Sequence, residues 1–583
     1  MLEKGYAKQI DKNTERSRIW YVPIFGIYNI NKPNKVRVVF DCAAKTNGIS
    51  LNDQLDAGPD LLRPLPGILI RFRQYAVAIK SDISDMFLRV KIIEHDKAIR
   101  YLYRGRDRHR EPDEFECTCL IFGAASSPTS AIFIKNKNAQ RYAKSKPLAV
   151  QGIIDDSYMD DLISSQKSDS TAVEFIQGVI KINSEAGFQM HGWASNKSEV
   201  INKALNIEDS PKSGQTSLGK TENERVLGMY WDTETDELKF NVKLAKIPIQ
   251  ILRGQRIPTK REVLSVIMSI YDPLGLIAPF TLKSKVLMQA NHRSGIHWDD
   301  KLREEEYTSW LIWLSETEKI KHCKINRCYT PSGTNEEAQL HVFCDASMIA
   351  FAAAAYLRFE KHDGKAHVAL VMTKNRTASL KRETIPRLEL QAALLGARLA
   401  NFLKNELRIK ITRRVFCSDS STVIQWIRSE PREHNIFVAN RLGEIAELTQ
   451  SSEWKWVPTA DNPADDATRL ENDALRLNSR WFNGPSFLSQ NEKTWPAESF
   501  PEELQKLKHG ESINKQSKIA ILNPYVDKNQ ILRASGRVTL LLGDFNNEPI
   551  ILNGKHSAVK NLITHFHRKY YHSSSNTVIN ELR

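Results

Sequence analysis

The chain has 583 residues, of which 41% are apolar or aromatic and 26% are charged. This usage is typical of globular proteins and excludes a disordered or fibrous chain, and the length predicts about three or four domains. The net charge of +14 favours a polyanionic partner, with nucleic acid as the first candidate. Seven cysteines without a regular spacing predict free thiols rather than a disulfide scaffold.

The N-terminal segment, residues 1–20, is charged and lacks the apolar core of a signal peptide. The least charged long stretch, residues 263–282, is interrupted by Asp272, Pro273 and Pro279. We therefore expect no signal peptide, no transmembrane segment and no membrane partner. The expected location is intracellular, in a cytoplasmic particle or the nucleus, and the sequence leaves the oligomeric state open.

The first part of the chain, residues 1–240, mixes short β-type runs with helical patterns, which predicts an α+β domain. The expected strands cover residues 36–40, 75–79 and 99–103, and the expected helix covers residues 172–186. Five arginines lie in the third strand or shortly after it: Arg100, Arg104, Arg106, Arg108 and Arg110. They form either a loop that contacts a nucleic-acid template or a solvated hairpin tip.

The rest of the chain is expected to form further units. Residues 241–330 are mostly helical, with amphipathic segments at 261–271 and 304–320. Residues 331–475 are predicted as an α/β domain, whose expected strands cover residues 339–344, 352–357, 367–372 and 414–418, with a long helix from Pro386. Residues 476–523 are expected to be a linker with a small aromatic patch, and residues 524–583 a small, basic, partial domain.

Three early carboxylates indicate the first chemistry. Asp82 follows the strand at 75–79, and Asp160 and Asp161 lie together after Tyr158 and Met159. Adjacent carboxylates repel each other, and a divalent cation balances them. Two Mg²⁺ ions held about 4 Å apart are what in-line attack of a hydroxyl on a phosphate requires. An isolated Asp-Asp pair is more often ordinary turn chemistry, so the surrounding motifs decide.

Four later carboxylates lie where secondary structure is expected to bring them together. Asp345 ends the first strand of the second α/β domain, Glu389 lies on its helix, Asp419 ends a later strand and Asp465 opens a last helical turn. Each alone would be read as a surface acid or a helix cap. Four acids that converge can hold two Mg²⁺ ions for hydrolysis of a phosphodiester.

The motifs around these acids resemble the Pol polyprotein of BEL/Pao-type LTR retrotransposons. The polymerase part of the resemblance rests on residues 36–41, 50–52, 82–87, 122–128, 158–161, 225–231 and 259–279. The ribonuclease H part rests on residues 343–347, 387–390, 416–420 and 462–465. The resemblance implies polymerase fingers, palm and thumb, a helical connection, and a ribonuclease H-like mixed sheet with helices.

The resemblance also implies roles for single residues. Asp82, Asp160 and Asp161 would be the catalytic, metal-binding acids of the polymerase, and Asp345, Glu389, Asp419 and Asp465 those of the ribonuclease. Nucleotide-binding residues would be Arg37, Phe87, Gly123, Tyr158 and Met159, with Phe87 as the steric gate against a 2′-hydroxyl. A core phenylalanine is the alternative for Phe87, and His191 is either a proton donor or a structural histidine.

The C-terminal residues resemble the start of an integrase zinc-binding domain. His567 and His572 would supply two ligands of an incomplete zinc site, because no cysteine follows Cys417. Zinc is therefore expected only if the missing integrase segment is supplied. Surface histidines on a basic segment are the alternative.

The sequence predicts a two-part enzyme that uses Mg²⁺ or Mn²⁺. Its expected partners are an RNA template, a DNA primer, deoxynucleoside triphosphates and RNA–DNA hybrid. The competing hypotheses are a catalytically decayed or domesticated remnant that only binds nucleic acid, and a ribonuclease alone.

Overall fold

The computed structural model describes residues 1–11, 16–29, 32–105, 107–206, 224–240, 248–330, 337–361, 365–381, 383–429, 434–470, 475–476, 478–496, 524–526 and 532–534. The chain divides into two compact units, Met1–Trp495 and Pro496–Arg583. In the second unit, the described strands β22 (Pro524–Val526) and β23 (Leu532–Ala534) pair antiparallel. The histidines considered as zinc ligands, His567 and His572, lie outside the described residues.

The N-terminal part contains a four-stranded sheet of order β1-β9-β8-β2. Its strands are β1 (Ala7–Ile10), β9 (Asp113–Cys117), β8 (Ile99–Tyr103) and β2 (Trp20–Tyr21). The hairpins β3 (Ile24–Asn29) with β4 (Lys32–Phe40) and β5 (Lys45–Thr46) with β6 (Ile49–Ser50) accompany it. Tyr101 stacks on Phe115 at 5.2 Å between ring centroids, and Phe40 meets Tyr101 edge-on, which builds a small aromatic core.

The arginine-rich stretch contains one buried, structural arginine and several exposed ones. Arg100 is buried in β8, with its guanidinium 3.5 Å from Glu114 and 4.0 Å from Glu116, so it is structural. Arg104 donates to the carbonyl of Arg108 in the loop that follows β8, and Arg110 pairs with Asp113. Arg104, Arg108 and Arg110 are exposed, as either a solvated tip or a template-contacting loop requires.

The next sheet has the order β10-β11-β7-β12, and all its pairings are antiparallel. Its strands are β10 (Ser157–Tyr158), β11 (Asp161–Gln166), β7 (Val77–Ile83) and β12 (Met190–Ser195). The helices α1 (Leu65–Phe72), α2 (Ser127–Gln140), α3 (Pro147–Asp155), α4 (Asp169–Glu185) and α5 (Ser198–Ala204) accompany it. Val77, Ile79 and Leu162 pack against Phe175 and Ile176 of α4, so burial of these side chains fixes which face of the sheet the helices cover.

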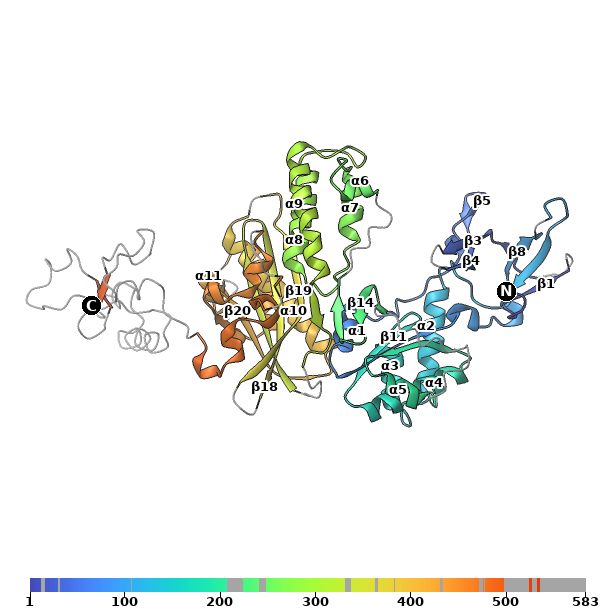
Figure 1. Cartoon of the computed structure of the whole chain (residues 1–583), viewed down its shortest axis with the longest axis horizontal. Coiled ribbons are helices and arrows are strands. Elements are labelled where there is room, and N and C mark those ends of the chain that lie inside the picture. Colours follow the sequence, from blue (N-terminus) through green and yellow to red (C-terminus); the bar gives the residue numbers. More distant parts are fainter. Residues whose placement is uncertain are drawn as a thin grey trace, which may run out of the picture. The chain divides into compact units, whose positions relative to one another are not determined.

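The expected helical section combines a small sheet with four helices. The sheet β13-β14-β15-β16 joins β13 (Glu224–Val226), β14 (Met229–Asp232) and β15 (Glu237–Lys239) to β16 (Lys324–Asn326). The helices are α6 (Ile249–Leu252), α7 (Lys260–Met268), α8 (Ala278–Arg293) and α9 (Glu304–Lys321). A capping box begins α7, since Thr259 accepts from Glu262 N and Glu262 accepts from Thr259 N. Figure 1 shows α8 and α9 running side by side.

The last large sheet has the order β19-β18-β17-β20-β21 and pairs β17 with β20 and β20 with β21 in parallel. Its strands are β17 (Glu337–Ala346), β18 (Ala350–Glu360), β19 (Ala366–Thr377), β20 (Lys410–Ser418) and β21 (Trp454–Trp456). The helices are α10 (Ile385–Glu406), α11 (Ser421–Ile427) and α12 (Ile436–Leu448). A Cβ at Gly396 of α10 would lie 2.4 Å from Cys344 Sγ, so the glycine permits close packing of helix on sheet.

Residues 480–495 fall within the expected linker, and the described part of this segment packs on the last sheet. Helix α13 (Arg480–Asn483) is followed by short 3₁₀ turns. Trp481 is fully buried, its Nε1 donates to Leu276 O at 2.8 Å, and its own carbonyl accepts from Tyr356 Oη. Trp481 and Phe482 of the aromatic patch noted in the sequence are buried, as are Phe487 and Leu488 in the following turn.

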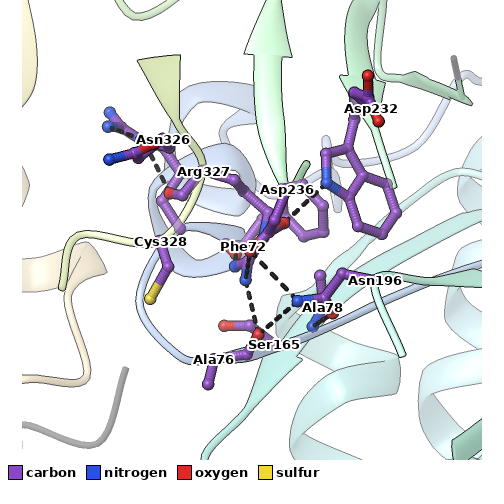
Figure 2. A network of polar contacts seen from close by, with 12 residues as sticks. Phe72, Ala76, Ala78, Ser165, Asn196, Asp232, Asp236, Asn326, Arg327 and Cys328 are labelled. Atoms are coloured by element: carbon purple, nitrogen blue, oxygen red, sulfur yellow. Dashed lines mark hydrogen bonds and ion pairs between the residues drawn. The ribbon is translucent and has the colours of Figure 1, made fainter. Parts of the chain in front are cut away.

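A buried guanidinium joins the segment that leads into β7, in the sheet of the early carboxylates, to the small sheet β13-β14-β15-β16 (Figure 2). Arg327 follows β16 and donates to Phe72 O, Tyr75 O and Ala76 O at 2.6–2.9 Å. Its remaining donors form a bidentate pair with Asp236 at 2.6 and 2.8 Å. All five donors of the guanidinium are used, which is the requirement for burying it without a large penalty.

The overall architecture is thus a mixed α and β fold with several sheets, as expected. Among the described residues, no helix combines the length and the apolar character needed to cross a bilayer.

We predict that Arg327→Met destabilises the folded chain by about 3–5 kcal/mol, because Asp236 loses its ion-pair partner and the carbonyls of Phe72 and Tyr75 lose a donor inside the protein. The shift should appear as a lower urea midpoint in circular dichroism. Arg413→Met is the control, because its ion pair with Glu492 is exposed and should contribute at most about 1 kcal/mol. Equal midpoints for the two variants would contradict the prediction.

Candidate active sites

The three early carboxylates meet at one edge of the second sheet. In the β7–β11 register Asp82 lies opposite Asp161, and Asp160 belongs to the two-residue turn between β10 and β11. Met159 in that turn has a φ of 55°, a left-handed conformation that makes the turn tight. The amide of Ile83 donates to Asp160 O at 3.0 Å, which ties the turn to the end of β7.

Burial and mutual repulsion raise the pKa values of two acids in this cluster. Burial, followed by the charges of Asp160 and Asp82, raises the pKa of Asp161 to about 6. Burial and then Asp160 also raise the pKa of Asp82. Asp82 Oδ1 is buried without a hydrogen-bond partner. A cation between these oxygens would relieve both the burial and the mutual repulsion.

His191 lies beside Asp82 on the other side of β7. Its Nδ1 is 3.0 Å from Asp82 O and its Nε2 is 3.7 Å from Asp82 Oδ2. The imidazole is half exposed, so it is a surface histidine at the edge of the cluster and not a core residue.

Gly123 allows the turn that contains it to approach the end of β4 closely. Its φ is +104°, and a Cβ there would lie 2.4 Å from Phe40 O, so only glycine fits. Asn52 anchors this turn, because its Nδ2 donates to Gly123 O at 3.0 Å and its Oδ1 accepts from Ala125 N at 2.9 Å. Phe87, in the 3₁₀ turn η2 (Met86–Arg89), meets Phe122 edge-on at 4.9 Å.

Arg37, the expected triphosphate contact, lies in β4, and its side chain is outside the described residues. Tyr158, by contrast, is described and ends β10, directly before the Met159–Asp160 turn.

Another tight turn, between β13 and β14, packs against Tyr271 of the helical section. Leu227 and Gly228 have φ values of 46° and 94°, and a Cβ at Gly228 would lie 2.8 Å from the ring of Tyr271. Burial and, to a smaller extent, the nearby Tyr158 raise the pKa of Tyr271. The helical section therefore approaches the strand before the early carboxylates through Tyr271.

A lysine near this cluster was not singled out from the sequence. Lys135 of α2 is buried, and burial lowers its pKa to about 7 while the charge of Asp160 opposes that shift. Lys135 is one of two lysines in α2, so only the tertiary structure reveals that it is the one close to Asp160.

The late carboxylates converge at the last sheet. The parallel β17–β20 register places Cys344 beside Ser418, so Asp345 and Asp419, one residue further, are neighbours. Glu389 comes from the second turn of α10. One oxygen from each of Asp345, Glu389 and Asp419 lies within 4.8 Å of the others, the one group of this kind among the described residues.

Burial and repulsion act on this group more strongly than on the first. Burial, then Asp345 and Asp419, raises the pKa of Glu389 to about 9. Burial and Asp419 raise the pKa of Asp345 to about 7, although Thr468 Oγ1 donates to its Oδ2. Glu389 Oε2 is buried and has no hydrogen-bond partner.

Asp465 lies beside the group but is not part of it. It belongs to the 3₁₀ turn η7 (Pro463–Ala467), and burial raises its pKa. Its carboxylate pairs with Arg469 at 2.6 Å and Arg480 at 3.4 Å. The neighbouring Asp466 forms a closer, two-point contact with Arg480 at 2.8 and 3.1 Å.

The carboxylates suit divalent cations in both clusters, but among the described residues only the late cluster brings three ligand oxygens within 4.8 Å of one another. Each cluster offers carboxylate oxygens, which Mg²⁺ and Mn²⁺ prefer, and each contains a buried oxygen without a donor. Asn462 supports the second cluster, since its Nδ2 donates to Cys344 O at 3.0 Å and Asp419 Oδ1 at 3.2 Å. The motif that contains Asn462 was recognised in the sequence, whereas the role of Thr468 was not.

Comparison with known proteins finds one matching family and similar folds among solved structures. Residues 259–420 match the family of the Pao retrotransposon-like RNaseH-like domain. A foamy viral protease-reverse transcriptase dRH in complex with double-stranded DNA is similar in fold, with a TM-score of 0.50 and 14% identity over 78% of this chain and 67% of that chain. A foamy viral protease-reverse transcriptase with RNA/DNA hybrid gives a TM-score of 0.48 and 13% identity, over 79% of this chain and 52% of the other. No curated protein matches the chain.

The matched family is that of a ribonuclease H-like domain, and the chain shares its fold with a reverse transcriptase. The match over residues 259–420 confirms, for that segment, the Pao-type resemblance found in the sequence. The matched segment begins at the first residue before α7 and includes Asp345, Glu389 and Asp419.

The raised pKa of Glu389 predicts a pH-dependent stability without metal. Its contribution is complete below the unfolded pKa of 4.5 and is lost as the pH rises towards about 9. In EDTA at pH 8, Glu389→Gln should therefore raise the thermal midpoint by about 2 °C or more. At pH 4 the two proteins should melt together.

Glu447→Gln, at an exposed position of α12, serves as the control and should not change the midpoint at either pH. The same midpoint for Glu389→Gln and the parent at pH 8 would show that Glu389 is not held in an unfavourable environment.

Proposed function

We propose that the chain is a reverse transcriptase that extends a DNA primer on RNA and DNA templates and cleaves the RNA strand of the hybrid. The observation that carries this proposal is the presence of two separate carboxylate clusters, on two sheets of one unit. The net charge of +14 supports a nucleic-acid partner, and a similar fold has been seen in complex with double-stranded DNA.

In the first site, Asp82, Asp160 and Asp161 would hold Mg²⁺ or Mn²⁺. When bound, the ions would activate the attacking hydroxyl and balance the charge that develops on the phosphate. The tight Met159–Asp160 turn keeps Asp160 next to the end of β7. We assign the turn around Gly123 to the nucleotide, because a position without a Cβ lets backbone approach closely.

Phe87 is proposed as the steric gate of this site. Its edge-on contact with Phe122 fixes the ring, and a fixed ring can exclude a 2′-hydroxyl, which selects deoxynucleoside triphosphates. Arg37 remains the proposed contact to the triphosphate.

In the second site, Asp345, Glu389, Asp419 and Asp465 would hold the ions that activate water for hydrolysis of the RNA strand. Asn462 orients Asp419, and Thr468 orients Asp345. In the absence of metal Asp465 pairs with two arginines, which keeps a partly buried carboxylate next to three others.

The test is primer extension on an RNA template with Mg²⁺, with hybrid cleavage read from the same reactions. Asp160→Asn should reduce extension more than about 100-fold and leave cleavage intact, because only the first cluster loses a ligand. Asp465→Asn should have the opposite effect.

Asp466→Asn is the matched control for Asp465→Asn, because Asp466 binds Arg480 and is not proposed as a ligand. It should retain most of both activities. If the parent protein binds hybrid but neither extends nor cleaves, the chain is a nucleic-acid binder and the enzyme proposal fails. Cleavage without extension would leave a ribonuclease alone.

A further inference from the structure

Asn375, on the edge strand β19, connects the helical section to the ribonuclease H-like site. Its side chain is 8% exposed. The amide Nδ2 donates to Ala278 O, in the first turn of α8, at 3.1 Å and to Ala467 O at 3.3 Å. Ala467 ends the η7 turn, two residues after Asp465. One amide thus holds the turn that carries a proposed metal ligand against the start of a helix.

Lys285 of α8 sets the orientation of this amide. Its Nζ donates to Asn375 Oδ1 at 2.5 Å and to Asn375 O at 3.2 Å. Because an ammonium group can only donate, Oδ1 must face Lys285, and Nδ2 must face the two carbonyls. Lys285 lies in the lining of a cavity of about 320 Å³, with Asp272 and Asn375 also in its wall.

The start of α8 is itself fixed to β19. Thr373 N donates to Leu274 O at 2.8 Å, so the turn before α8 pairs with the edge strand. A Cβ at Gly275 would lie 2.2 Å from Thr373 O, which makes glycine necessary for this approach. Asp272 accepts from the amides of Leu276 and Ile277 at 2.8 and 2.9 Å, which holds the turn in shape.

The η7 turn needs such a support. Its other contacts to the site are made by Asn462 at its start and by Thr468 after its end. Asp465 is not among the three acids that already converge, so its reach to a shared ion depends on where the turn lies. Asn375 is the contact that holds the C-terminal end of the turn from the side of β19 and α8.

We propose that Asn375 is a positioning residue for the ribonuclease H-like site, and that it places Asp465 by holding Ala467 against helix α8. The inference rests on the proposed function. It makes the helical section a structural part of the nuclease site, which gives a physical reason for a single family segment that begins at residue 259 and includes three of the acids.

The test measures metal binding as well as activity, in the full chain. Mn²⁺ is titrated by electron paramagnetic resonance in an Asp82→Asn/Asp160→Asn background, so that the ribonuclease H-like cluster is the main remaining site. Asn375→Ala should weaken Mn²⁺ binding there about 10- to 100-fold, the usual effect of losing a group that orients a ligand. Without the two background changes, hybrid cleavage should require correspondingly more Mg²⁺, and primer extension should be unchanged.

Gln289→Ala is the matched control. Gln289 also belongs to α8 and donates to Ala378 O, directly after β19, at 2.7 Å, but among the described residues it has no hydrogen bond to η7. It should leave both Mn²⁺ binding and cleavage as in the parent. A purely structural role of the α8–β19 contact would instead weaken both variants alike, and that result would overturn the proposal.

Asn375→Asp keeps the shape and the contact with Lys285 but cannot donate to the two carbonyls, so it decides the matter if the alanine variant does not fold. It should weaken Mn²⁺ binding as well. Parent-like binding and cleavage in this variant would refute the role of Asn375 and leave the proposed function standing. Absence of cleavage and of Mn²⁺ binding in the parent would refute the proposed function itself.

Discussion

Buried arginines connect the sheet that holds Asp82 with the sheet that holds Asp345. Arg327 uses all five donors on three carbonyls of the α1–β7 connection and on Asp236. Arg73, also buried, donates to Asn326 O and Arg327 O and, on its other side, to Leu370 O and Val371 O of β19. Because these carbonyls are buried, replacing either arginine would remove hydrogen bonds that water cannot readily restore.

An ion-pair cluster strengthens the same connection. Asp156 is fully buried and accepts from Arg71, Ser164 and Arg408, and Arg71 also donates to Glu406 at the end of α10. Both carboxylate clusters are therefore supported by strands and helices that are tied to one another. This matters because each cluster concentrates like charges in a partly buried place, and only a rigid surround keeps them there.

The sequence predicted much of this arrangement, and the reasons are physical. The strand at 99–103 and the helix from 304 agree closely with β8 and α9, because alternation and helical periodicity are local properties. The seven acids were singled out because they lie within recognisable motifs, at strand ends, in short turns or, for Glu389, on a helix. Asp345, Glu389 and Asp419 meet as expected, whereas Asp465 is described with two arginine partners.

What could not be predicted depends on distant partners. Nothing local distinguishes Arg327 or Asn375 from a surface residue, since their acceptors come from segments up to about 250 or 100 residues away. Lys135 and Thr468 belong to the same class. The aromatic residues of the expected linker were visible in the sequence, but that Trp481 covers Leu276 and Tyr356 follows only from the fold.

We propose that the two carboxylate clusters are two metal sites of one enzyme. Anomalous diffraction from crystals grown with Mn²⁺ tests this most directly. We expect anomalous peaks among Asp82, Asp160 and Asp161, and others among Asp345, Glu389 and Asp419. Crystals that contain Mn²⁺ at saturating concentration and show no peak at either cluster would contradict it.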